Sequence, residues 1–139
     1  MKLQMDRDAL NVFLKEAFPQ VADTYAVESV TDDLLVARLG VDDSHLRPGG
    51  TVSGPAMFGL ADVAIYLAIL ARIGPVALAV TTNCSIDFMR KPVAGADLLC
   101  EARILELGRV QAVADALIYS EGMAKPVARA SMTYSIPPK

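Results

Sequence analysis

One stretch of the sequence restricts the possible folds more than any other, because it is apolar on almost every face of a helix. Residues 55–72 read PAMFGLADVAIYLAILAR, and their only acidic residue is Asp62. A helix of this kind is buried on most sides, so the rest of the chain has to surround it. Pro55 suits its first turn, and Gly74-Pro75 ends it. Since burial disfavours a charged carboxylate, Asp62 needs either a partner or a function.

After this helix the apolar period changes to two, which predicts strands. The segments are 76–88, 97–108, 109–120 and 125–136, with a hairpin turn at Gly108-Arg109 and another at Glu121-Gly122. In the first segment the even positions are mostly apolar, so we expect Thr81 and Asn83 to share the opposite face. The last three segments present faces of mainly small apolar side chains: Leu98, Cys100, Ala102, Ile104; Val110, Ala112, Ala114, Ala116, Ile118; Ala128, Ala130, Met132, Tyr134, Ile136. Small side chains let a helix lie close to a sheet.

The N-terminal part predicts one helix and two strands. Residues 6–18 repeat apolar side chains with helical spacing, with Asp6 or Asp8 as N-cap and Pro19 as the stop. Residues 24–30 and 34–41 read as short strands around a turn at 31–33. We therefore expect one α+β domain over residues 1–139, in which an antiparallel sheet wraps the long helix. The open sheet edges favour a homodimer, or a dimer of dimers, in which the sheets pair edge to edge.

Composition excludes several classes of function. A net charge of −3 and a pI near 5.0 argue against nucleic acid as a partner. Cys84 and Cys100 lack CxxC spacing, and with a single His they predict neither a disulfide framework nor a zinc site. The N-terminus becomes charged at once, unlike a signal peptide, and residues 55–71 are shorter than a membrane span and contain Asp62. We expect a cytoplasmic protein that does not enter a membrane.

The loop before the long helix carries the most specific pattern. Residues 47–55, RPGGTVSGP, are followed four residues later by Leu60-Ala61-Asp62-Val63-Ala64. This resembles the pattern N-P-x-G-x-x-H-G-G, then L-x-D-x-A, of hot-dog fold thioesterases, specifically the PaaI-like acyl-CoA thioesterase branch. The resemblance covers nearly the whole chain. It departs from the pattern where Arg47 replaces Asn or Gln and Ser53 replaces His.

The resemblance implies hydrolysis of an acyl-CoA thioester, with coenzyme A as part of the substrate and no other cofactor. Asp62 matches the catalytic carboxylate, as general base or nucleophile, and Gly54 matches the glycine whose N–H polarises the thioester carbonyl. Arg47 and Ser53 occupy positions that help to place the substrate or the attacking water. The remaining candidate contacts are Pro55 at the helix start, Thr81 and Asn83 for the water, and Arg90, Lys91 and Arg109 for the coenzyme A phosphates.

The spacing of the two main candidates suggests that they act across two subunits. Asp62 lies eight residues after Gly54, just over two helical turns, so one thioester does not easily bridge both within a subunit. The alternatives are a hot-dog protein that binds acyl-CoA or a lipid without hydrolysing it, and a dimer in which Asp62 only fixes subunit pairing. A triad of His45, Ser53 and Asp62 lacks the GxSxG elbow of serine hydrolases.

Overall fold

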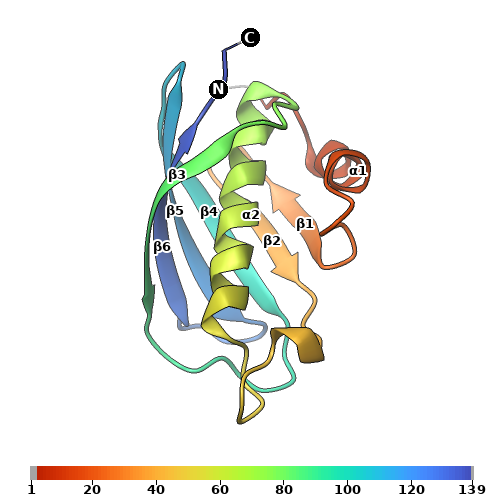
Figure 1. Cartoon of the computed structure of the whole chain (residues 1–139), viewed down its shortest axis with the longest axis vertical. Coiled ribbons are helices and arrows are strands. Elements are labelled where there is room, and N and C mark those ends of the chain that lie inside the picture. The colour runs from red at the N-terminus through yellow and green to blue at the C-terminus, as the bar shows by residue number, and fades with distance from the viewer. Residues whose placement is uncertain (1–2, 139) are drawn as a thin grey trace.

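The computed structural model describes residues 3–138, and its elements follow the predicted order (Figure 1). A 3-10 turn, η1, precedes the long helix. The bounds are α1 Arg7–Ala17, β1 Tyr25–Val30, β2 Leu35–Leu39, η1 Asp43–His45, α2 Gly54–Ile73, β3 Val80–Phe88, β4 Leu98–Leu107, β5 Gln111–Ser120 and β6 Ala128–Ser135.

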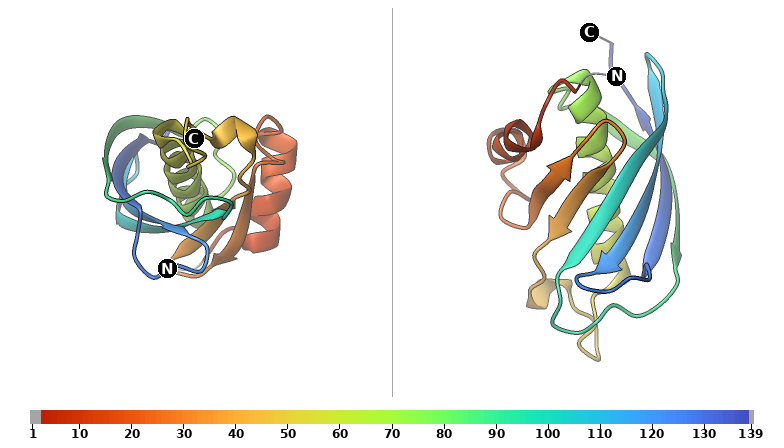
Figure 2. Two further views of the ribbon diagram at one scale, coloured as in Figure 1. Left: turned by 90° about the horizontal axis from the view of Figure 1, so that it is seen from below. Right: turned by 180° about the vertical axis from the view of Figure 1, so that it is seen from behind.

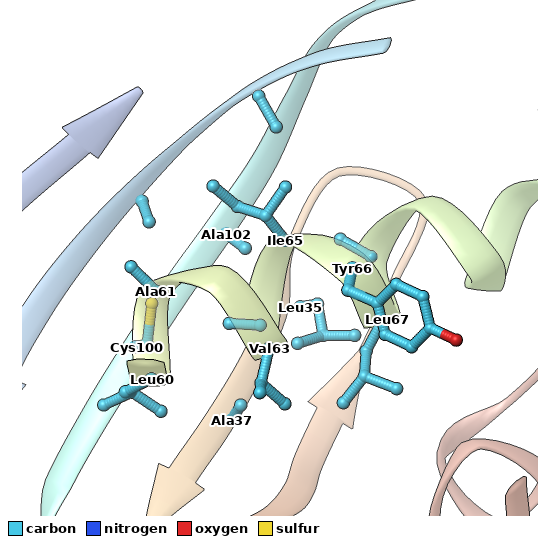
Figure 3. Packing of buried hydrophobic residues seen from close by; sticks show 14 of the residues in the cluster. Leu35, Ala37, Leu60, Ala61, Val63, Ile65, Tyr66, Leu67, Cys100 and Ala102 are labelled. Atoms are coloured by element: carbon cyan, nitrogen blue, oxygen red, sulfur yellow. The ribbon is translucent and has the colours of Figure 1, made fainter. Parts of the chain in front are cut away.

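The strands form one antiparallel sheet in the order β1-β2-β4-β5-β6-β3, which curves around α2 (Figure 2). Small side chains cover the face toward the helix, and all of these are at most 1% exposed: Ala37, Cys100, Ala102, Ala112, Ala114, Ala116, Ala128, Ala130. Figure 3 shows Leu60, Ala61 and Ile65 of α2 packed near Cys100 and Ala102 of β4. The small side chains of the sheet thus leave room for the bulky side chains of the helix, which confirms the predicted arrangement.

Helix α2 is buried as its composition requires. The residues from Val63 to Ala71 are all buried, whereas Pro55 and Phe58 are exposed near its N-terminus. In the described part of the chain, α2 is the one helix that is long and apolar enough to span a membrane. Of its most apolar 18 residues, 67% are buried inside the fold. A core helix meets the same criteria of length and composition.

The two edges of the sheet differ in how they are covered. At the β1 edge, α1 packs beside the strand, and the Asn11 side chain accepts a hydrogen bond from the Val27 N–H at 2.8 Å and donates one to the Val27 carbonyl at 3.1 Å. Asp6, one of the two residues expected as N-cap of α1, fills that role and accepts from the Ala9 N–H at 2.9 Å. At the other edge, β3 pairs with β6 alone. The β3 edge is therefore the one left open to another chain.

Two strand predictions were wrong in detail. The third strand begins at Val80 rather than at residue 76, because residues 76–79 close a turn in which the Ala79 N–H bonds the Val76 carbonyl at 3.1 Å. A β-bulge between Thr81 and Asn83 then shifts the register. Val110, expected on the inner face, precedes β5 and is 61% exposed.

Candidate active site

The carboxylate of Asp62 is held by hydrogen bonds from two strands. The Thr81 hydroxyl of β3 donates to Oδ1 at 2.5 Å, and the Tyr134 hydroxyl of β6 donates to the same oxygen at 2.6 Å. Tyr134 also lies 3.0 Å from the Asp62 carbonyl oxygen. Both donors bind Oδ1, and no described residue donates to Oδ2. No buried polar side-chain atom among residues 3–138 lacks a partner, so Oδ2 faces solvent.

The neighbours of Asp62 respond to its burial and charge. Tyr134 is 3% exposed, and this burial is the main reason that its pKa is raised. The negative charge of Asp62 and the hydrogen bond from Tyr134 to Asp62 raise the pKa further. The Tyr134 hydroxyl therefore keeps its proton and remains a donor. Burial and the Asp62 charge also raise the pKa of the Cys84 thiol, so this cysteine is a poor nucleophile.

A pocket of about 410 Å³ opens beside Asp62, between α1, α2 and the turn before β3. Three aromatic rings line it. Phe18 and Tyr66 meet edge to face with centroids 6.2 Å apart, and Tyr66 lies 6.2 Å from Tyr134. At its rim Leu78 is 81% exposed. An apolar pocket that ends at a carboxylate suits the acyl part of an ester or thioester.

The first turn of α2 leaves one backbone donor unused. Ser53 is the N-cap: its hydroxyl accepts from the Ala56 N–H at 3.3 Å and its carbonyl from the Met57 N–H at 3.1 Å. Pro55 has no N–H. The Gly54 N–H has no acceptor among residues 3–138, at the end of the helix where the dipole favours negative charge. The ring of Phe88 covers Gly54, since a Cβ on Gly54 would lie 3.3 Å from its Cζ.

A second pocket, of about 350 Å³, lies at this helix start and is basic on one side. Arg47, Arg90 and Lys91 line it together with Gly54 and Phe88. Arg90 donates to the Pro126 carbonyl at 2.7 Å, which fixes its direction while its side chain stays exposed. Three cationic side chains thus border one exposed groove at the start of α2.

The structure separates several residues that the sequence grouped. Gly54 and Asp62 line different pockets, and eight residues of helix place them about 12 Å apart along its axis. Arg109 lies at the opposite end of α2, in a cavity of about 630 Å³ formed with Ile73 and Val110. Within one subunit it therefore does not share a groove with Arg90 and Lys91.

The bulge in β3 also corrects the expectation for Asn83. Thr81 pairs with Tyr134 on the inner face, whereas Asn83 pairs with Thr133, is exposed and lies on the outer face. The two side chains therefore do not share a face, and only Thr81 contacts Asp62. A strict period of two cannot reveal a bulge, which inserts one extra residue.

The other loop residues have local partners or open surroundings. The His45 Nδ1 accepts from the Asp42 N–H at 2.9 Å, so the ring closes a local turn rather than a triad with Ser53. Pro55 is exposed at the helix start, and the Arg47 side chain makes no ion pair with any described residue. No described residues form a cluster of three or more potential metal ligands.

Sequence reasoning missed two residues of this region. Tyr134 was placed only on an inner strand face, although a tyrosine among alanines opposite a helix acid is a signal for a hydrogen bond. Phe88 is one of the apolar even positions of its predicted strand, but it is 52% exposed and lies on Gly54. Nothing in the spacing of the sequence brings Phe88 to the start of α2.

Comparison with known proteins identifies the family. The model of the thioesterase superfamily matches residues 49–127. A crystal structure of a candidate thioesterase from Silicibacter sp. TM1040 is 56% identical, with a TM-score of 0.93, and covers 99% of this chain and 96% of its own. A candidate esterase of Pseudomonas aeruginosa is 32% identical over 103 residues, which are 74% of this chain and 75% of that protein.

Two further structures share the fold. A mutant of the phenylacetic acid degradation protein PaaI from Thermus thermophilus is 30% identical, with a TM-score of 0.73, over 86% of this chain and 99% of that one. A thioesterase-like protein from Streptococcus pneumoniae, solved with coenzyme A, has a TM-score of 0.76 at 22% identity, over 91% and 98% of the two chains. The fold seen here, an antiparallel sheet around one long helix, is shared with the PaaI structure, and the family model matches more than half of the chain. This chain therefore belongs to the PaaI-like hot-dog proteins of the thioesterase superfamily.

Proposed function

We propose that this protein hydrolyses acyl-CoA thioesters at a site shared by two subunits. The observation that carries the proposal is the pair of unused groups on α2, the Gly54 N–H and the Asp62 Oδ2, which open into different pockets. A thioester group is too short to span about 12 Å of helix. A second copy of the chain can bring its own Asp62 to the first copy's Gly54.

The reaction needs only these groups and water. The Gly54 N–H and the positive end of the helix dipole stabilise the oxygen on which negative charge develops. As a general base, Asp62 takes a proton from a water molecule while the water oxygen attacks the carbonyl carbon. As a nucleophile, the Asp62 carboxylate attacks that carbon itself, and water then hydrolyses the resulting acyl-enzyme. The C–S bond breaks, its electron pair leaves with sulfur, and the thiolate of coenzyme A takes up a proton. The products are the free acid and coenzyme A.

The open edge of β3 supports a homodimer. The β1 edge is covered by α1 through Asn11, but β3 pairs with β6 alone. Apolar side chains are exposed close to that edge, namely Val80, Phe88 and Met89, and also Phe58 on α2. We propose that two copies pair along β3, and that two such dimers are able to assemble further.

The two pockets suggest how the substrate divides. The pocket beside Asp62 suits the acyl group, and the groove of Arg47, Arg90 and Lys91 suits the phosphates of coenzyme A. The Streptococcus pneumoniae neighbour, solved with coenzyme A, supports this class of substrate. We propose that the protein acts in the cytoplasm and needs no further cofactor. Arg109 reaches this groove only if another subunit supplies it.

The test is an assay of the purified protein against short, long and aromatic acyl-CoAs, with release of free thiol as the readout. Asp62→Asn and Asp62→Ala remove the base and should lower kcat by at least about a hundredfold. Asp32→Asn changes an exposed carboxylate in the turn between β1 and β2, and as the matched control it should behave as wild type.

Other outcomes separate the alternatives. Turnover that survives in both Asp62 variants would contradict the role of this residue. Binding of acyl-CoA by the wild type without turnover would favour a binding protein, which the replaced positions Arg47 and Ser53 make the second candidate. Loss of the dimer in Asp62→Asn would favour a role in subunit pairing.

A further inference from the structure

A tyrosine hydroxyl lies against α2 one turn before Asp62. Tyr25 is the first residue of β1, and a Cβ built on Gly59 would lie 2.9 Å from its hydroxyl oxygen. Real side chains avoid so short a contact, so the absence of a side chain at Gly59 allows the hydroxyl to lie there. Tyr25 lies outside the sequence motif of residues 47–64 from which the candidate site was predicted.

The position of Gly59 places this hydroxyl on the same face of the helix as Asp62. Residues three apart in a helix are neighbours, with Cβ positions about 5–6 Å apart, so the Tyr25 hydroxyl at Gly59 and the Asp62 side chain occupy adjoining parts of one helix face. Burial and then the Asp62 charge raise the pKa of Tyr25, which agrees with this proximity and keeps the phenol neutral.

Both groups are available to a water molecule. The Tyr66 hydroxyl donates to the Ala77 carbonyl at 2.9 Å and the Tyr134 hydroxyl donates to Asp62, but the Tyr25 hydroxyl bonds no described residue. The Asp62 Oδ2 is likewise without a donor among the described residues. Neither atom is a buried polar atom lacking a partner, so both face solvent. Two open polar groups thus lie near each other on one half-buried face of α2.

Ser53 and Arg47, the two loop residues expected to help place the attacking water, are not free to do so beside Asp62. The Ser53 hydroxyl accepts from the Ala56 N–H at 3.3 Å as the cap of α2. Arg47 is exposed in the basic groove at the helix start. Thr81 of β3 contacts the Asp62 Oδ1, which leaves the side of Oδ2 to a group from another element.

We propose that Tyr25 is a further residue of the site and holds the attacking water together with Asp62. The proposal rests on the thioesterase function proposed above. The water donates one hydrogen to the Asp62 Oδ2 and the other to the Tyr25 oxygen, which leaves a lone pair directed at the carbonyl carbon. On attack, the new C–O bond forms and the proton passes to Asp62. Tyr25 stays neutral throughout.

Two variants at different positions test the same contact. Tyr25→Phe removes the hydroxyl, and Gly59→Ala places a methyl group where that hydroxyl lies. Each should lower kcat by about tenfold, as expected for one lost hydrogen bond, with little change in KM. Alanine favours a helix more than glycine, so the melting temperature of Gly59→Ala should not fall. Tyr119→Phe changes a part-exposed tyrosine of β5, and as the control it should keep the wild-type kcat.

The double variant Tyr25→Phe/Gly59→Ala separates a role in the reaction from a role in stability. Because both changes remove the same contact, the double variant should be no slower than either single variant. Additive losses, or a kcat loss that follows a lower melting temperature, would overturn the role of Tyr25. An unchanged kcat in Tyr25→Phe while Asp62→Asn is inactive would overturn it and leave the proposed function intact. A wild type without turnover on every acyl-CoA would overturn both.

Discussion

Gly54 differs from the other residues at the start of α2 because its backbone N–H is not used inside the subunit. Ser53 takes up the N–H groups of Ala56 and Met57, and Pro55 has none. This distinction depends on three adjacent residues, namely Ser53, Gly54 and Pro55. The N–H, rather than any side chain, is the group that we propose polarises the carbonyl.

Replacement of Gly54 by proline tests that role directly. Proline removes the N–H, and the first helical position tolerates it. Ser53 already has the extended conformation that precedes proline, with φ −74° and ψ 157°. Gly54→Pro should therefore fold, and its kcat should fall by about 10²–10³-fold, as for loss of an oxyanion-hole donor.

Gly54→Ala is the matched control for that variant. It keeps the N–H and adds the same Cβ, 3.3 Å from the half-exposed Phe88 ring, which can move aside. It should lose far less activity than Gly54→Pro. Equal losses in both variants would show that space at Gly54 matters and that its N–H does not. Circular dichroism and thermal unfolding would confirm that both variants are folded.

At the scale of elements, sequence patterns predicted most of the fold but failed at irregular strands. The inner faces of β4, β5 and β6 follow a period of two, because each alternate side chain must fit against α2. β3 does not follow this period, because it contains a bulge and most of its residues are exposed, so burial does not dictate which side chains are apolar. As a result Asn83 was predicted on the same face as Thr81, although it lies on the other face.

Arg38 of β2 connects β1 with the residue before β4 and the residue after β5, at one end of the sheet. It donates to Glu28 of β1 at 2.6 Å, to Asp97 at 2.9 Å and to Glu121 at 2.6 Å. The Arg38 guanidinium lowers the pKa of Glu121, whereas the Val41 N–H, followed by Arg38, lowers the pKa of Asp97. Carboxylates with lowered pKa values stabilise the fold above their unfolded pKa values and lose this effect as pH falls through the folded ones.

Arg38→Met should therefore destabilise the protein most at neutral pH. The difference in free energy of unfolding from wild type should shrink as pH falls below about 4, where carboxylates take up protons. Arg129→Met is the control, because Arg129 forms one exposed pair with Asp87, and it should have a much smaller effect. Urea unfolding at neutral and at acidic pH measures both. A difference that does not depend on pH would show that Arg38 acts through packing.

At the scale of the whole molecule, the sequence motif indicated candidate residues for the site but not the distant residues that pack against them. The sequence motif predicted Asp62, Gly54 and the basic residues at the start of α2. It did not predict the contacts of Tyr25 and Phe88 with Gly59 and Gly54, because these form only when distant segments pack. It also grouped Arg109 with Arg90 and Lys91, although the length of α2 separates them within one subunit.

The central claim is that one active site takes Gly54 from one subunit and Asp62 from the other. Mixing two inactive proteins tests it, one with Asp62→Asn and the other with Gly54→Pro. After the subunits exchange, each mixed dimer contains one site with both native residues and one site with neither.

Thiol release from an equimolar mixture should recover to roughly a quarter of the wild-type rate, since half of the dimers are mixed and each has one intact site of two. Sedimentation should show the same oligomeric state for the wild type, both variants and the mixture. A mixture whose dimers exchange, shown by differently tagged subunits, and that still has no activity would contradict the shared site.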